Sequence, residues 1–187
     1  YNVLNGSHPF KDYWSITGPS LDYIQAAFFF IFGVNWFSYV FHASVMNLIL
    51  ALFSYFLFKE LGLKQIYSFF YSLGIALLAY PSIGVPFIDH HSTIFSILAI
   101  YCFILSTKNE KKFLFFLIPI FFGLAFFSKQ IPSAYIIILF ASVLLFEIFY
   151  NFKKDLFISL FFSTILFLFF IFLIFTINKI PLDSFFL

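Results

Sequence analysis

The residues best suited to chemistry in this chain stand together as Asp89-His90-His91-Ser92. A carboxylate followed by two imidazoles can coordinate a divalent metal ion or relay a proton to and from a substrate. These residues follow a segment rich in Pro and Gly and precede a long apolar stretch. A structural interpretation competes with the chemical one: Asp89 or Ser92 caps the next helix, and the histidines lie among lipid headgroups.

Two further groups contain a lysine. Lys11 and Asp12 lie in a polar opening segment, where a carboxylate beside an ammonium group could bind a metal ion and a phosphate. The alternative there is a solvated loop with a surface ion pair. Lys129-Gln130 separates two apolar stretches, and the lysine could hold a lipid phosphate by charge. It could equally be a turn residue whose ammonium group reaches the headgroups.

His42 lies inside an apolar stretch, where an ionisable side chain is costly and often functional. A neutral histidine can also hydrogen-bond to a neighbouring helix, and we favour that interpretation. The single cysteine, Cys102, lies in another apolar run with no Cys or His at metal-ligand spacing, so we expect it to serve in packing.

The composition indicates what surrounds these residues. Of the 187 residues 63% are hydrophobic and only 10% are charged, and the mean hydropathy is +1.05. A soluble domain carries roughly 25% charged residues, so this chain cannot cover itself with polar surface in water. A net charge of +2 gives no basic patch for nucleic acid. We therefore expect an all-α, polytopic integral membrane protein that forms one transmembrane domain over residues 1–187.

Six apolar stretches are predicted to cross the bilayer: 36–58, 65–80, 92–106, 113–127, 132–150 and 156–178. Pro119 lies within the fourth and is expected to kink that helix rather than end it. Residues 1–20 are predicted to form an outer loop. Residues 21–33 then form a helix too short to span, since a bilayer needs roughly 20 residues, so we expect it to lie at the membrane interface.

Lysine placement predicts the orientation, because loops on the cytoplasmic side are enriched in positive charge. Seven lysines follow the first, third and fifth stretches: Lys59, Lys64, Lys108, Lys111, Lys112, Lys153 and Lys154. The other side has three: Lys11, Lys129 and Lys179. The loops that carry Asp12, Asp89 and Lys129 are therefore expected on the outer face.

The order of the motifs carries a family resemblance. The opening reads Gly6-Ser7-His8-Pro9-Phe10-Lys11-Asp12-Tyr13-Trp14, then Thr17-Gly18-Pro19, then a short helix that ends Phe30-Ile31-Phe32-Gly33. It resembles the first outer loop of membrane glycosyltransferases of the GT-C class, in particular the mannosyltransferase-like and aminoarabinose-transferase-like families. The Asp-His-His of residues 89–91 resembles the acidic segment of a later outer loop in those families. The resemblance covers roughly residues 1–130.

The resemblance implies an enzyme of a bacterial inner membrane. Such an enzyme moves a sugar from a polyprenyl-phosphate donor to a lipid, glycan or protein acceptor at the outer face. Carried over to this chain, the catalytic residues are Asp12 and Asp89. The substrate contacts are Lys11, His90 and Lys129, and a divalent metal ion would bind Asp12, His90 and His91. The principal acid of those families lies upstream of Tyr1, so the chain as given is expected to be inactive alone.

Two other functions compete with this one. If the chain were a transporter or channel, we would expect ionisable groups near the middle of the spans. The middle of each span is nearly all apolar, which counts against this function. If the chain were a non-catalytic membrane scaffold subunit, the Asp12 and Asp89 side chains would not be expected to come together.

Overall fold

The computed structural model describes residues 1–15, 18–81, 84–109, 112–151 and 154–180. In those ranges the chain is helical, and its only β-type pairing is an isolated bridge between Pro9 and Tyr13. A short 3-10 helix, η1 (Asn2–Asn5), precedes seven α-helices: α1 (Ser20–Phe32), α2 (Trp36–Glu60), α3 (Gln65–Ala79), α4 (Ile88–Asn109), α5 (Lys112–Ser128), α6 (Gln130–Asn151) and α7 (Lys154–Ile177). The predicted all-α class is confirmed.

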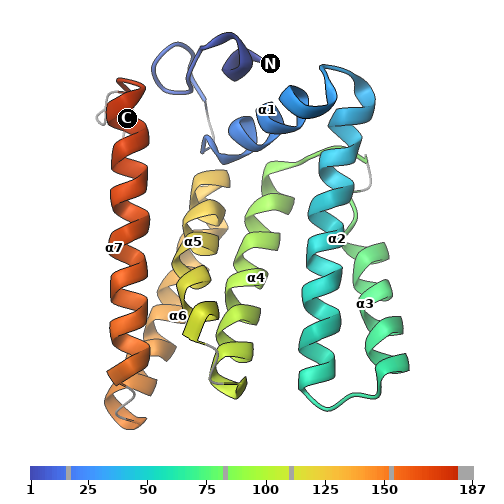
Figure 1. Ribbon diagram of the computed structural model, residues 1–187, viewed down its shortest axis with the longest axis vertical. Helices are drawn as coiled ribbons and strands as arrows, with labels where there is room; N and C mark the ends of the chain where they lie inside the picture. The colour runs from blue at the N-terminus through green and yellow to red at the C-terminus, as the bar shows by residue number, and fades with distance from the viewer. Residues whose placement is uncertain (16–17, 82–83, 110–111, 152–153, 181–187) are drawn as a thin grey trace.

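The helices form an up-and-down bundle with a helix across one end. In Figure 1, α2 to α7 run side by side and reverse direction at each connection, while α1 lies across the end at which α2 begins. We call this end of the bundle the α1 end. The N-terminal segment, the start of α4, the turn between α5 and α6 and the end of α7 all lie there.

Four of the helices are long and apolar enough to cross a membrane: α2, α4, α6 and α7. The chain is therefore an integral membrane protein. The described helices α3 and α5 have 15 and 17 residues. They are about 22 and 25 Å long, against a hydrocarbon core of about 30 Å. The lengths of the described helices therefore support four of the six predicted spans.

Local sequence explains where several helices begin and end. Gly33, with a φ of 81°, ends α1, and the Asn35 side chain accepts a hydrogen bond from the Ser38 N–H at 2.9 Å to cap α2. Pro119 lies inside α5 without ending it, as predicted. One boundary differs clearly from the prediction, because α4 begins at Ile88 rather than at residue 92. Asp89 suits the first turn of a helix, where the N-terminal dipole favours a negative charge.

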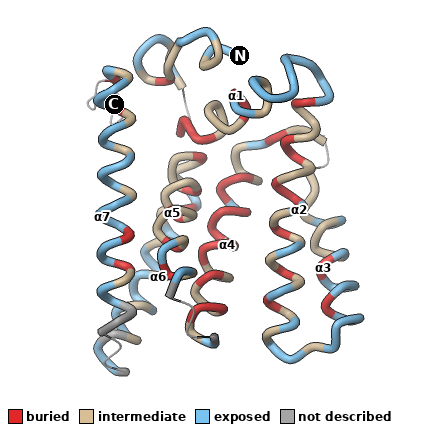
Figure 2. Tube along the Cα trace, viewed as in Figure 1, coloured by how far each residue is buried: buried red, intermediate tan, exposed pale blue. Residues whose placement is uncertain are grey.

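The buried core lies where α2, α4 and α5 meet, as Figure 2 shows along α2 and α4 in particular. One buried cluster contains Met46, Leu50, Ile94, Phe95, Leu98 and Ala125, and the other contains Ala99, Cys102, Phe115, Ile118, Phe122 and Leu160. Cys102 is therefore a packing residue, as expected. Helices α3, α6 and α7 expose many large apolar side chains, which suits contact with lipid.

Candidate functional site

The N-terminal segment is tied into a compact turn that contains Lys11 and Asp12. One carboxylate oxygen of Asp12 accepts a hydrogen bond from the His8 N–H at 2.7 Å, and the Phe10 N–H donates to the Tyr13 carbonyl at 2.9 Å. The Lys11 ammonium group donates to the carbonyl oxygen of Asn178 at 3.0 Å. Asp12 thus closes the turn, and Lys11 reaches from it to the end of α7.

Side chains of α1 hold this segment over the bundle. The Tyr13 hydroxyl donates to the Asp22 carboxylate at 2.8 Å, and a His8 ring nitrogen pairs with the Tyr23 hydroxyl at 2.9 Å. Burial, together with the hydrogen bond to Asp22, raises the pKa of Tyr13 well above its usual range. Tyr13 therefore stays a neutral donor, and Asp22 is engaged in positioning rather than available to a ligand.

A glycine allows the segment to reach α1 past the end of α5. Gly18 is buried, and a Cβ placed on it would lie 1.9 Å from the Phe127 carbonyl oxygen. The obstacle is backbone, which cannot turn aside as a flexible side chain would. Gly18 is thus a close-approach position that fixes the N-terminal segment against α5.

Asp89 and Lys129 form an ion pair across the α1 end. Asp89 lies in the first turn of α4 and Lys129 in the turn between α5 and α6, and the Ser92 hydroxyl also donates to the Lys129 carbonyl at 3.3 Å. The Asp89 side chain is 45% exposed and the Lys129 side chain 36%. Both charges can therefore be reached by a ligand from outside the bundle.

The two histidines beside Asp89 point to different partners. A ring nitrogen of His90 contacts the Ala79 carbonyl, and its other ring nitrogen is buried without a partner. The His91 ring turns into the bundle. In the ranges that the structure describes, no three His, Cys, Asp or Glu side chains lie close enough to hold a metal ion. The described residues therefore do not bring Asp12, His90 and His91 together as a metal site, and that site stays a prediction.

His91 instead meets His42, which lies on α2. Both side chains are 0% exposed, and their Nε2 atoms are 2.9 Å apart. The Nδ1 of His91 donates to the Phe87 carbonyl at 2.9 Å, and the Nδ1 of His42 lies 2.8 Å from the side-chain oxygen of Gln25 on α1. Phe28 stacks on the His42 ring with centroids 4.7 Å apart. The chain of contacts joins α1, α2 and α4, which confirms the expectation that His42 bonds to a neighbouring helix.

The number of ring protons determines which group donates in each of these hydrogen bonds. Three contacts link two imidazole rings to two oxygen acceptors, whereas two neutral imidazoles carry only two ring protons. Reversing the Gln25 amide supplies the third proton, because its NH₂ group then donates to His42. His42 can then donate to His91 and His91 to Phe87, with no net charge on either ring. Gln25 keeps one unpaired amide atom in either orientation.

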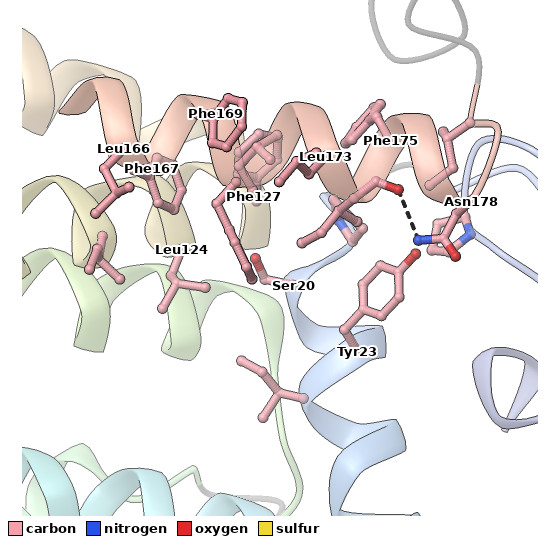
Figure 3. A pocket seen from close by; sticks show the side chains of 18 of the residues that line it. Ser20, Tyr23, Leu124, Phe127, Leu166, Phe167, Phe169, Leu173, Phe175 and Asn178 are labelled. Atoms are coloured by element: carbon pink, nitrogen blue, oxygen red, sulfur yellow. Dashed lines mark hydrogen bonds between the residues drawn. The ribbon is translucent and has the colours of Figure 1, made fainter. Parts of the chain in front are cut away.

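An apolar cavity of about 800 Å³ lies between α5 and α7, and residues of α1 and of the N-terminal segment also line it. Figure 3 shows Leu166, Phe167 and Leu173 of α7 facing Leu124 and Phe127 of α5. The polar residues Ser20, Tyr23 and Asn178 line it at the α1 end, where the Tyr23 ring points toward Asn178. The volume lies within the range of about 300–1,000 Å³ that is usual for small-molecule sites.

The structure thus unites some predicted site residues and separates others. Asp12, Asp89, Lys11, His90 and Lys129 all lie at the α1 end, but the described contacts join only Asp89 with Lys129. Sequence reasoning missed the pairing of His42 with His91, although an ionisable residue in an apolar stretch had singled out His42. It also missed Gln25 and the cavity, because neither follows from a motif.

No protein-family model, curated protein or solved structure matches this chain.

Proposed function

We propose that this chain belongs to a membrane glycosyltransferase that moves a sugar from a polyprenyl-phosphate donor to a lipid, glycan or protein acceptor. In this proposal all six helices α2 to α7 cross a bacterial inner membrane, α1 lies at the interface, and the α1 end faces outward. The order of motifs in the N-terminal segment and the seven-to-three distribution of lysines support it.

The observation that carries the proposal is the position of the Asp89–Lys129 ion pair. A partly exposed carboxylate and a partly exposed ammonium group lie at the same end of the bundle as Lys11 and as the polar end of the apolar cavity. Transfer of a sugar from a lipid-linked donor requires these features: an apolar space for the lipid chain, a cation for the phosphate and a base for the acceptor hydroxyl.

The reaction can be written with these groups. The acceptor hydroxyl attacks the anomeric carbon of the sugar, and the bond from that carbon to the phosphate oxygen breaks. Asp89 accepts the proton of the hydroxyl, and Lys129 orients its carboxylate. The polyprenyl phosphate leaves with its new negative charge balanced by a lysine at the α1 end, Lys11 or Lys129. Asp12 contributes by closing the turn that presents Lys11.

The test is sugar transfer by membranes from cells that express the complete gene. They are supplied with a panel of polyprenyl-phosphate hexoses, and the release of polyprenyl phosphate is measured. We expect release from at least one donor. Because a general base contributes about 10²–10⁴-fold, Asp89→Asn should lower the rate at least about 100-fold, with Asp89→Glu recovering part of it.

The matched control is Glu60→Gln, which removes a carboxylate from the opposite end of the bundle, where α2 ends. It should leave the rate unchanged, and both variants should keep the thermal midpoint of the parent protein in detergent. Failure of every donor, or full activity of Asp89→Asn, would contradict the proposal.

A second candidate is a transporter, which the buried His42–His91 pair favours because ionisable groups inside spans often mark proton pathways. The pair lies within two turns of the helix starts rather than near the middle of the bilayer. Proton uptake into vesicles that depends on His42, without any sugar transfer, would favour this alternative.

A further inference from the structure

A turn of the N-terminal segment lies against the α1 end of the cavity. It consists of residues 9–13, and Pro9 and Phe10 belong to the cavity lining. The neighbouring lining residues are Tyr23 of α1 and Asn178 at the end of α7. Figure 1 shows the N-terminal segment above α1 and beside the end of α7. The turn therefore bridges α1 and α7 at this end of the cavity.

The turn has an apolar inner side and a charged outer side. Pro9 is buried and Phe10 is partly buried, and both line the cavity. The next two residues, Lys11 and Asp12, are exposed. A cover over an apolar cavity needs this division, because its inner side meets apolar walls while its charged groups must stay in water.

The contacts of the turn with α1 are better protected than its contact with α7. On the α1 side, Tyr13 and the adjacent His8 each form a partly buried side-chain hydrogen bond, at 2.8 and 2.9 Å. On the α7 side, the Lys11 ammonium group donates to the Asn178 carbonyl at 3.0 Å in an exposed position. Water replaces an exposed hydrogen bond at little net cost. The turn should therefore separate from α7 while it stays attached to α1.

Phe10 has a strained backbone conformation. Its φ of 66° lies in the left-handed region, which is uncommon for a bulky residue. Hydrogen bonds of the turn hold it there: the Phe10 N–H donates to the Tyr13 carbonyl and the Asp12 N–H to the His8 carbonyl, both at 2.9 Å. Strain of this kind persists only where its surroundings enforce it, and it is common in ligand clamps and switch regions. Opening of the turn would release it.

We propose that residues 9–13 form a gate at the α1 end of the cavity. In the closed state Phe10 obstructs entry, and Lys11 latches the turn to α7. Opening breaks the hydrogen bond between Lys11 and Asn178 and moves the turn away from α7 about its attachment to α1. The gate acts on entry from the aqueous side and requires no sugar transfer, so it stands or falls separately from the proposed function.

The experiment measures how fast a thiol behind the gate reacts. Ser20→Cys places this thiol in the cavity lining, at a position that is 7% exposed, in a background where Cys102 is replaced by Ser. The purified protein in detergent is treated with a charged, water-soluble methanethiosulfonate, so the result does not depend on orientation in a membrane. We expect Ser20→Cys to react at least about tenfold more slowly than Asn5→Cys, which lies on an exposed residue.

Two substitutions should open the gate. Lys11→Met removes the latch and Phe10→Ala removes the obstructing ring, and each should speed the labelling of Ser20→Cys at least about fivefold. Lys11→Arg keeps a cationic donor and should label at the parent rate. The thermal midpoint of each variant checks that the protein remains folded.

Two controls separate gating from a change of charge and from general loosening. Lys179→Met removes an exposed lysine from the same end of α7 and should leave the labelling of Ser20→Cys unchanged. Ser38→Cys places a thiol at a buried position of α2 outside the cavity lining, and Lys11→Met should not speed its labelling.

Three outcomes would overturn the gate. Lys11→Met or Phe10→Ala could leave the labelling rate of Ser20→Cys unchanged, which would show that the turn does not control entry. Ser38→Cys could gain the same factor as Ser20→Cys, which would show that the whole bundle had loosened. Ser20→Cys could react as fast as Asn5→Cys in the otherwise unchanged protein, which would show that the turn does not close the cavity.

Discussion

At the residue scale, the contact between His42 and His91 makes a prediction about stability. Both rings are 0% exposed, and among the described residues each ring is the partner of the other at Nε2. Removing either ring leaves a buried nitrogen unpaired, which costs about 1–3 kcal/mol. We therefore expect His42→Ala and His91→Ala each to lower the free energy of unfolding in detergent by at least that amount.

The two losses should not add, because both substitutions remove the same link. The double variant should cost less than the sum of the single variants by about 0.5–3 kcal/mol. Leu52→Ala serves as the control, since Leu52 is an exposed residue of the same helix and its loss should matter little. Strict additivity of the two histidine substitutions would show that the rings do not interact.

The sequence predicted which residues matter at this scale better than it predicted their partners. Asp89, Lys129 and His42 stand out because charged or ionisable groups are rare in this chain. Their partners depend on how each helix is rotated about its axis. Apolar residues surround α2 on every side, so its pattern does not show that His42 faces α4.

At the element scale, the contact between Gly18 and α5 makes a second prediction. A Cβ at this position would meet the Phe127 backbone, so Gly18→Ala should push the N-terminal segment away from α5. The cost expected for such overpacking is about 1–3 kcal/mol. Limited digestion with trypsin measures the effect directly, because a displaced segment should be cut faster after Lys11.

Gly74 provides the matched control for this substitution. It lies within α3 with nothing within 4 Å of the position a Cβ would take. Gly74→Ala should stabilise the protein by about 0.5–1 kcal/mol, because alanine loses less backbone freedom on forming a helix. Equal trypsin sensitivity of both variants and the parent would contradict the role given to Gly18.

Helices were easier to predict than their ends. The six long apolar stretches and the short helix after Gly18-Pro19 all correspond to observed helices, because continuous hydrophobicity and Gly or Pro boundaries are local signals. The start of α4 was placed four residues late, since Asp89, His90 and His91 read as loop residues. In the structure they belong to the first turn, where the ion pair with Lys129 and the contact with His42 hold them.

At the scale of the whole molecule, composition predicted an integral membrane protein, and four helices of the structure have the length and hydropathy to span. The gathering of the N-terminal segment, the start of α4 and the α5–α6 turn at one end follows from strict alternation of helix direction. The cavity could not be foreseen, because it depends on the distance between α5 and α7. The two helices meet where the Phe167 ring of α7 lies against Gly123 of α5.

The central claim is that the groups of the candidate site share the outer membrane face. Its most direct test is labelling of single cysteines with a membrane-impermeant thiol reagent, in a background where Cys102 is replaced by Ser. Asn5→Cys reports on the N-terminal segment, Ile131→Cys on the start of α6 next to the α5–α6 turn, and Lys64→Cys on the α2–α3 connection. We expect the first two to react in intact spheroplasts and the third to react only after the membrane is opened. Labelling of Asn5→Cys and Ile131→Cys from opposite sides would contradict six crossings and a single-faced site.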